Sequence, residues 1–319
     1  MKILIIRFSS IGDIVLTTPV IRCCKQQIDK AEIHFITKNV FKLVLQHNPY
    51  IDKLITFEKD VTEVYDILKK ENYDVVIDLH NNLRSRRLKT KLGKKSFSFK
   101  KLNIQKFLAV TFKTKNSLPD VHIVQRYLET VESLGVRDDD KGLDYFLLAD
   151  EKVNMSTISP VLSSGFVALV VGGSYYTKKI PLNKLIEICN ASKLPIVLMG
   201  GKEDNEIAKQ VIAKTKNTFN ACGKFSINQS ASIIEQSNYV VTSDTGLMHI
   251  ASAFKKIIFS VWGNTIPEFG MYPYLPDPKS KILEVNDLKC RPCSKLGYSK
   301  CPKGHFKCMN EIDIKEITV

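Results

Sequence analysis

The stretch that decides the fold is Val240-Val241-Thr242-Ser243-Asp244-Thr245-Gly246-Leu247-Met248-His249-Ile250-Ala251-Ser252-Ala253. It begins as a buried strand, and from Leu247 its apolar residues recur at helical spacing. Ser243 and Asp244 stand where the helix N-cap is expected. A strand that ends in small polar residues and opens a helix presents free backbone N–H groups to an anion. We hypothesise that a nucleotide-sugar pyrophosphate binds there, although an ordinary capped helix would look the same.

Length and composition predict a globular protein with two domains. A chain of 319 residues is long enough for two cores, and its 44% apolar and 25% charged residues are typical of soluble proteins. The apolar run at 3–6 is too short for a signal peptide, and no run approaches the length of a membrane span. We therefore expect a cytoplasmic protein.

The net charge of +14 is concentrated in one part of the chain. From Arg84 to Lys115 there are twelve Lys or Arg residues and no Asp or Glu. Such a block suits a polyanion, which could be nucleic acid, an anionic membrane face or a phosphorylated glycolipid. A solvated basic surface without a specific partner is the alternative.

Short apolar runs alternate with helical patterns along the chain, which predicts βαβ units and parallel sheets. In the first half the expected strands are 2–7, 32–36, 53–57, 74–79 and 96–99, and the expected helices are 14–27, 39–46, 61–70, 104–112 and 121–134. After a linker at 149–164, strands are expected at 165–171, 195–199, 218–221, 239–241 and 257–261, and helices at 182–191, 203–215 and 227–236. The fold class is therefore α/β, with two doubly wound, Rossmann-like domains facing across a cleft and ligands at the carboxyl ends of the strands. The domain bounds are 1–155 and 165–289, followed by a Cys-rich tail at 290–319.

In the first half, Asp13 is the only ionisable side chain between Ser9 and Thr18. A carboxylate beside Gly12 at a cleft edge can act as a general base that takes a proton from a hydroxyl acceptor. Capping the following helix is its alternative role.

In the second half, residues 172–179 form a glycine-hydroxyl-lysine loop whose backbone amides, with Ser174 and a lysine, could hold a pyrophosphate. The Walker spacing is absent, and no G-x-G-x-x-G follows the first strand. Glu203 and Glu206 could bind ribose hydroxyls, although acids in a first helical turn need no ligand to explain them.

Together these segments resemble glycosyltransferase family 9, the ADP-heptose:lipopolysaccharide heptosyltransferases. The matching pieces occur in the family's order from residue 1 to about 265, and they are 5–19, Asp78-Leu79-His80, 122–128, Lys178-Lys179-Ile180-Pro181, 200–204 and 243–249. One piece alone would be weak, whereas the ordered set is specific.

The resemblance implies a GT-B fold and an inverting transfer of heptose from ADP-heptose to the lipopolysaccharide inner core, with no cofactor required for catalysis. The N-terminal domain would bind the acceptor and the C-terminal domain the nucleotide sugar. Asp13 would be the general base. The residues expected to bind the donor are Ser174, Lys178, Glu203, Ser243, Asp244, Thr245, Gly246 and His249. The acceptor is expected at Ser10, Gly12, Arg84 and Arg87. Ile180 departs from the aromatic residue that is common in the family, and the ribose contact stays open between Glu203 and Glu206.

The basic block would then face a phosphorylated glycolipid at the cytosolic face of the inner membrane, with the enzyme peripheral on that face. A different nucleotide-sugar donor would keep the fold. A nucleic-acid-binding protein is an alternative of another class, but the sequence contains no nucleic-acid motif and few aromatics within the block. We therefore expect no nucleic-acid partner.

Four of the eight cysteines lie in the tail: Cys290, Cys293, Cys301 and Cys308. In a cytosolic protein such clustering points to metal before disulfides. A structural zinc held by these thiols, or by three of them and His305, would secure a tail with little core of its own. Reduced or partly paired thiols are the alternative.

Overall fold

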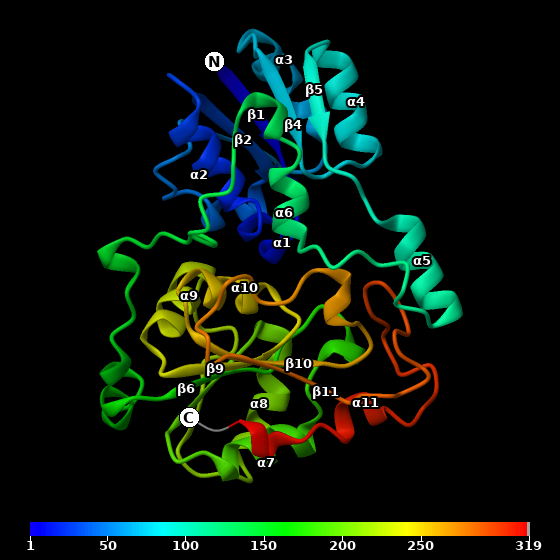
Figure 1. Cartoon of the computed structure of the whole chain (residues 1–319). Coiled ribbons are helices and arrows are strands. Elements are labelled where there is room, and N and C mark those ends of the chain that lie inside the picture. Colours follow the sequence, from blue (N-terminus) through cyan, green and yellow to red (C-terminus); the bar gives the residue numbers. More distant parts are fainter. Residues whose placement is uncertain (318–319) are drawn as a thin grey trace. The chain divides into compact units, whose positions relative to one another are not determined.

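The computed structural model of the chain describes residues 1–317, which form two compact units (Figure 1). One unit consists of Met1–Lys101 and Val121–Phe146, and the other consists of Leu102–Asp120 and the chain from Leu147 onward. The sequence places residues 1–155 in one domain. The structure instead groups Leu102–Asp120 with the second unit, because Ala109 is buried there in a small apolar cluster. The segment at 149–164, expected to be a linker, also belongs to that unit.

The first unit is built on a five-stranded parallel sheet of order β3-β2-β1-β4-β5. Its strands are β1 (Lys2–Ile6), β2 (Glu32–Lys38), β3 (Lys53–Phe57), β4 (Val75–Asp78) and β5 (Lys95–Ser98). Its helices are α1 (Ile11–Val15), α2 (Thr18–Gln27), α3 (Tyr65–Lys70), α4 (Leu83–Leu92) and α6 (Ile123–Leu128). From β1 the chain adds β2 and β3 on one side of the sheet and then crosses to add β4 and β5 on the other side of β1. The strand order therefore reverses between β1 and β4.

The helices of the first unit are shorter than the sequence predicts. The single helix expected at 14–27 is two helices, because Pro19 lies in the first turn of α2, where its missing N–H does no harm. Residues 39–44 form a 3-10 helix, as do 132–134, which end at Gly135 in the expected left-handed conformation.

The second unit contains a six-stranded parallel sheet of order β11-β10-β9-β6-β7-β8. Its strands are β6 (Val167–Val170), β7 (Ile196–Met199), β8 (Thr218–Asn220), β9 (Tyr239–Ser243), β10 (Ile257–Trp262) and β11 (Lys281–Glu284). Its helices are α5 (Asn103–Phe112), α7 (Leu182–Ala191), α8 (Asn205–Ile212), α9 (Ile227–Gln236), α10 (Gly246–Ala253) and α11 (Lys307–Asn310). The order reverses between β6 and β9. The edge strand β11 has no sequence prediction, because only Leu283 in it is buried.

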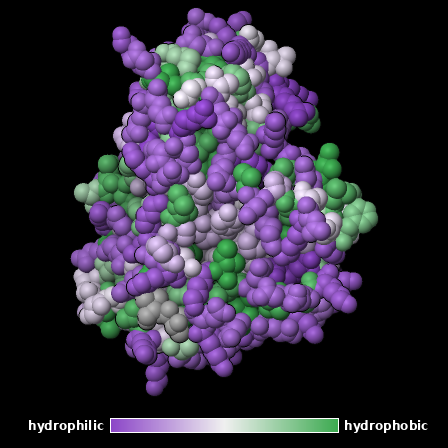
Figure 2. All heavy atoms as spheres, viewed as in Figure 1, coloured by the Kyte–Doolittle hydropathy of each residue, from purple (hydrophilic) through white to green (hydrophobic). Residues whose placement is uncertain are grey.

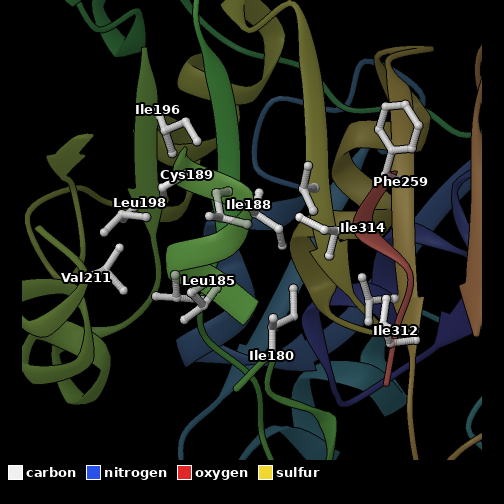
Figure 3. Packing of buried hydrophobic residues seen from close by; sticks show 14 of the residues in the cluster. Ile180, Leu185, Ile188, Cys189, Ile196, Leu198, Val211, Phe259, Ile312 and Ile314 are labelled. Carbon is white, nitrogen blue, oxygen red and sulfur yellow. The ribbon is translucent and has the colours of Figure 1, made fainter. Parts of the chain in front are cut away.

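The tail is part of the core of the second unit, contrary to the expectation that it has little core. Met309, Ile312 and Ile314 belong to the same buried cluster as Leu185 and Ile188 of α7. Figure 3 shows Ile312 and Ile314 pointing toward α7 and the sheet. The predicted α/β fold with two Rossmann-like domains is confirmed, although the tail is no separate module.

Within residues 1–317, none of the helices combines the length and apolar character that crossing a membrane requires.

Candidate active site

In the first unit, the loop after β1 holds Asp13 in a fixed hydrogen-bonded setting. Arg7 Nη2 lies 2.6 Å from Asp13 Oδ1, while the hydroxyl of Ser10 donates to Asp13 Oδ2 at 2.8 Å. The Ser10 backbone N–H also donates to Asp13 Oδ2, at 3.2 Å, because Asp13 is at the third position of α1 and Ser10 is its N-cap. The Asp13 side chain is 23% exposed, so its carboxylate is oriented yet open to solvent.

Arg7 itself is buried and surrounded by acceptors. It donates through Nε to the Ser9 carbonyl at 2.8 Å and through Nη1 to the Tyr127 hydroxyl at 2.9 Å. Burial acts to lower the pKa of Arg7, but Asp13, together with Tyr127 and Asp78, outweighs burial and the pKa is raised. Arg7 is therefore a fixed cation paired with the Asp13 carboxylate.

The loop after β4, the neighbour of β1, is organised by a fully buried carboxylate. Asp78 accepts hydrogen bonds from the backbone N–H groups of His80 and Asn81 at 3.0 and 2.7 Å, and from the Ser85 hydroxyl at 2.8 Å. Lys89 Nζ is 2.9 Å from Asp78 as well. These bonds attach the first two turns of α4 to the sheet, and α4 carries the predicted acceptor residues.

The predicted acceptor residues lie at the carboxyl ends of β1 and β4. The guanidinium of Arg84 lies 5.9 Å from the ring centroid of Phe8, the residue that follows Arg7 in the chain. Arg87 is exposed one turn further along α4. Gly12 is buried beside Asp13 in α1. The structure thus brings Ser10 and Gly12 beside Asp13, whereas the charges of both Arg84 and Arg87 act on Asp60.

Three residues of this unit, Asn48, His80 and Arg126, have buried polar atoms without a hydrogen-bond partner in the described chain. His80 Nδ1 is one, and burial, with the charges of Arg7 and Lys101, lowers the pKa of His80 to about 4. Arg126 is 5% exposed, and its Nε and Nη2 have no partner. Burial lowers the pKa of this arginine. The sequence analysis assigned Arg126 no role, and only its place in the matched segment 122–128 could have indicated one.

In the second unit, the loops after β6 and β9 meet at the strand-order reversal. Lys178 Nζ, from the loop after β6, lies 2.5 Å from Asp244 Oδ2, from the loop after β9. The Thr265 hydroxyl, after β10, is 3.4 Å from the same oxygen. Lys178 and Asp244, which the sequence places in two separate candidate loops, therefore belong to one site.

The start of α10 differs from the expected capping. The N-cap is Thr245, whose hydroxyl accepts from the Met248 backbone N–H at 3.3 Å and lies 3.0 Å from the Thr242 hydroxyl. The prediction that Ser243 and Asp244 cap the helix is wrong, because Thr245 fills that role and Asp244 is paired with Lys178. Ser243 belongs to β9, and its buried hydroxyl has no partner within the described residues.

The remaining predicted donor residues lie around the same strand ends. Gly246 opens α10 and His249 is buried on it. Ser174 follows the Gly172-Gly173 turn after β6. Glu203 is exposed but folds back over Gly201 after β7, whereas the Glu206 side chain is 73% exposed and pairs with Lys209. The geometry favours Glu203 over Glu206 as the residue nearer the strand end.

One strong ion pair of this site was not predicted. Lys179 Nζ lies 2.5 Å from Oδ1 of the buried Asp204, whose Oδ2 accepts from the Gly201 backbone N–H at 2.9 Å. A Cβ at Gly172 would meet Asp204 Oδ2 at 2.5 Å, so only glycine fits there. Asp204 thus fixes the loop that carries Lys178 against the loop after β7.

The tail cysteines lie near one another but not at metal-ligand distances. The pKa of Cys308 is raised to about 12 by burial, and the other three tail cysteines contribute electrostatically. Among residues 1–317, the only three His, Cys, Asp or Glu side chains whose ligand atoms all lie within 4.8 Å are Glu32, His34 and Glu71. That trio already pairs with Lys2, which is 3.1 Å from Glu32 and 2.9 Å from Glu71.

Two doubly wound units, each with polar residues at its strand-order reversal, have the GT-B architecture. The model of glycosyltransferase family 9 (heptosyltransferase) matches residues 61–301, well over half of the chain. The chain belongs to this family and is a glycosyltransferase.

Relatives with assigned functions agree with this placement. The chain is 26% identical over 294 residues to lipopolysaccharide heptosyltransferase 1 of Campylobacter coli, covering 83% of this chain and 84% of the relative. It is 28% identical over 307 residues to lipooligosaccharide heptosyltransferase 2 of Haemophilus ducreyi, covering 84% and 85%.

Solved structures show the same fold. A family 9 glycosyltransferase from Veillonella parvula superposes with a TM-score of 0.74 at 21% identity, covering 90% of this chain and 86% of that one. The E. coli ADP-heptose lipopolysaccharide heptosyltransferase II superposes with a TM-score of 0.66 at 19% identity over both full chains.

Proposed function

We propose that this enzyme transfers a heptosyl group from ADP-heptose to the lipopolysaccharide inner core, with Asp13 as the general base. The observation that carries the proposal is the Lys178–Asp244 pair at the strand-order reversal of the second unit, where a Rossmann-like domain binds its nucleotide. The names of the relatives support heptose as the sugar, and E. coli heptosyltransferase structures have been solved with ADP and with ADP-2-deoxy-2-fluoro heptose.

The reaction would proceed by displacement at the anomeric carbon of the donor. Asp13 removes the proton of the acceptor hydroxyl, whose oxygen bonds to the anomeric carbon as the bond to the β-phosphate oxygen breaks. ADP departs with that electron pair, so negative charge grows on its β-phosphate. Lys178 and the N-terminus of α10 would stabilise this charge.

The setting of Asp13 suits a base whose oxygens must be oriented before the acceptor arrives. Arg7 and Ser10 orient its two carboxylate oxygens, and the 23% exposure of the side chain lets an acceptor hydroxyl approach from solvent. The acceptor would be a phosphorylated glycolipid held by Arg84, Arg87 and the orphan guanidinium of Arg126. The enzyme would work peripherally at the cytosolic face of the inner membrane.

A panel of nucleotide sugars tests the proposal. The purified enzyme is incubated with a heptose-deficient inner-core acceptor and ADP-heptose, ADP-glucose, UDP-glucose or GDP-mannose, and release of the nucleoside diphosphate is measured. Acceptor-dependent release of ADP from ADP-heptose is expected. Release of UDP or GDP instead would identify a different nucleotide sugar as the donor, without contradicting the fold or the assignment of Asp13 as the base.

A further inference from the structure

Helix α5 presents its apolar side to solvent. Ile104, Phe107 and Phe112 are 74%, 56% and 68% exposed, whereas the small Ala109 on the opposite side is buried against Phe269. A surface helix normally buries its large apolar residues and exposes its polar ones. The exposed face of α5 therefore lacks a partner within the described chain.

The apolar surface continues onto the tail of the same unit. Leu296 is 62% exposed, and its neighbour Lys295 donates to the Asn103 carbonyl at 2.9 Å and lies 5.8 Å from the ring centroid of Phe107. Figure 2 shows apolar spheres gathered at the right-hand edge, where Figure 1 places α5. Exposed apolar patches bordered by polar groups mark interaction sites.

Lysines surround this patch. No Asp or Glu occurs from Leu102 to Pro119, α5 itself carries Lys106, and Lys113 and Lys295 border the helix. Lys113 reaches the Pro292 carbonyl at 2.7 Å, which keeps its ammonium beside the helix. Lys115 contributes less, because Glu268 pairs with it.

We propose that the exposed face of α5, together with Leu296, docks the enzyme on an anionic phospholipid surface. The apolar side chains would enter the boundary between headgroups and acyl chains, and the lysines would meet anionic headgroups. This inference rests on the proposed function, since a glycolipid acceptor lies in such a surface. A second copy of the chain fits less well, because two faces that each carry Lys106, Lys113 and Lys295 would repel each other.

Sedimentation with lipid vesicles tests this surface. The full chain is mixed with phosphatidylcholine vesicles that contain or lack phosphatidylglycerol. The test protein is the double variant Ile104→Ser/Phe107→Ser. The control is Val161→Ser, which removes a 42% exposed apolar side chain elsewhere in the same unit. Binding only to the anionic vesicles is expected. The double variant should bind about a hundredfold more weakly, roughly tenfold for each side chain withdrawn from lipid, and Val161→Ser should bind normally.

Activity on a soluble acceptor separates this inference from the proposed function. On an inner-core oligosaccharide without lipid, the double variant should release ADP at the wild-type rate. Wild-type inactivity on every nucleotide sugar would count against the proposed function while leaving the vesicle result valid. Unchanged vesicle binding by the double variant would overturn the docking surface, as would a wild-type dimer in light scattering that the double variant dissociates.

Discussion

Arg7 and Asp13 form a 2.6 Å ion pair in which the arginine is nearly buried and the carboxylate is partly open. The arginine is also fixed by the Ser9 carbonyl and the Tyr127 hydroxyl, so it cannot follow the carboxylate away from the strand end. The ion pair therefore holds the carboxylate at the strand end while part of its surface stays open to solvent. This arrangement suits a base whose position is set before the acceptor binds.

Asp13→Asn should reduce kcat by about 10²–10⁴-fold, because an amide cannot accept the acceptor proton. ADP affinity, measured by calorimetry, should be unchanged, because the donor phosphates are assigned to the second unit. Asp66→Asn, at an exposed position on α3, is the matched control and should keep full turnover. Strong residual turnover in the Asp13→Asn enzyme would remove the base assignment.

Lys178→Ala should weaken ADP binding by about 10–100-fold, the range expected for one charge-assisted hydrogen bond. The loss should be smaller for AMP, which lacks the β-phosphate that we assign to this lysine. Lys209→Ala removes a 62% exposed lysine from α8 and should leave both affinities unchanged. An ADP affinity equal to that of the wild type would show that Lys178 does not contact the phosphates.

The sequence was sufficient for the features that depend on local pattern. The sequence predicted ten of the eleven strands within residues 1–317, most of them from continuous apolar runs, and β11 was missed because an edge strand with one buried residue lacks that pattern. The polar loops after β1, β6 and β9 were found because such loops follow buried strands. Their internal pairings could not be found, since Lys178 and Asp244 are 66 residues apart and nothing local links them.

Two other features depended on tertiary packing. α5 follows the first sheet in the chain yet packs in the second unit, because Ala109 leaves room for Ile266 and Phe269. Arg126 looks like an ordinary helical arginine in sequence, and only its burial without a partner marks it. Periodicity predicts which face of an element is apolar, but not which distant residues will cover it.

His80→Gln should make the protein more resistant to acid. The folded pKa of His80 is about 4, below the ordinary value of 6.5, so the unfolded chain binds more protons between these values. Stability therefore falls as the pH drops from 6.5 to 4, by about 1–2 kcal/mol from this group after allowing for its partial exposure. Urea unfolding at about pH 7 and about pH 4.5 should show a smaller difference for the variant than for the wild type. An equal pH-dependent difference in the two proteins would mean that protonation of His80 does not destabilise the fold.

Arg126→Met should separate ligand binding from stability. Removing a buried cation whose Nε and Nη2 lack partners should leave the free energy of unfolding unchanged or higher, because its desolvation is not compensated within the fold. The KM for the acceptor should rise about tenfold, with ADP affinity unchanged. A marked loss of stability together with an unchanged KM would assign Arg126 a purely structural role.

The zinc that the sequence predicts in the tail would require the thiols to move. Burial raises the pKa of Cys293 to about 11 and that of Cys308 to about 12, so both are protonated thiols at neutral pH. A metal would therefore have to displace their protons and draw the sulfurs together. Elemental analysis should find about one zinc per chain, and Cys290→Ser should lose it. Cys189→Ala, which removes a core thiol outside the tail, should retain it.

Because segment 293–301 holds Thr177 through the Tyr298 backbone, a chelator should lower both the melting temperature and ADP affinity. A metal-free protein that melts normally in chelator would leave the cysteines as reduced thiols of the core.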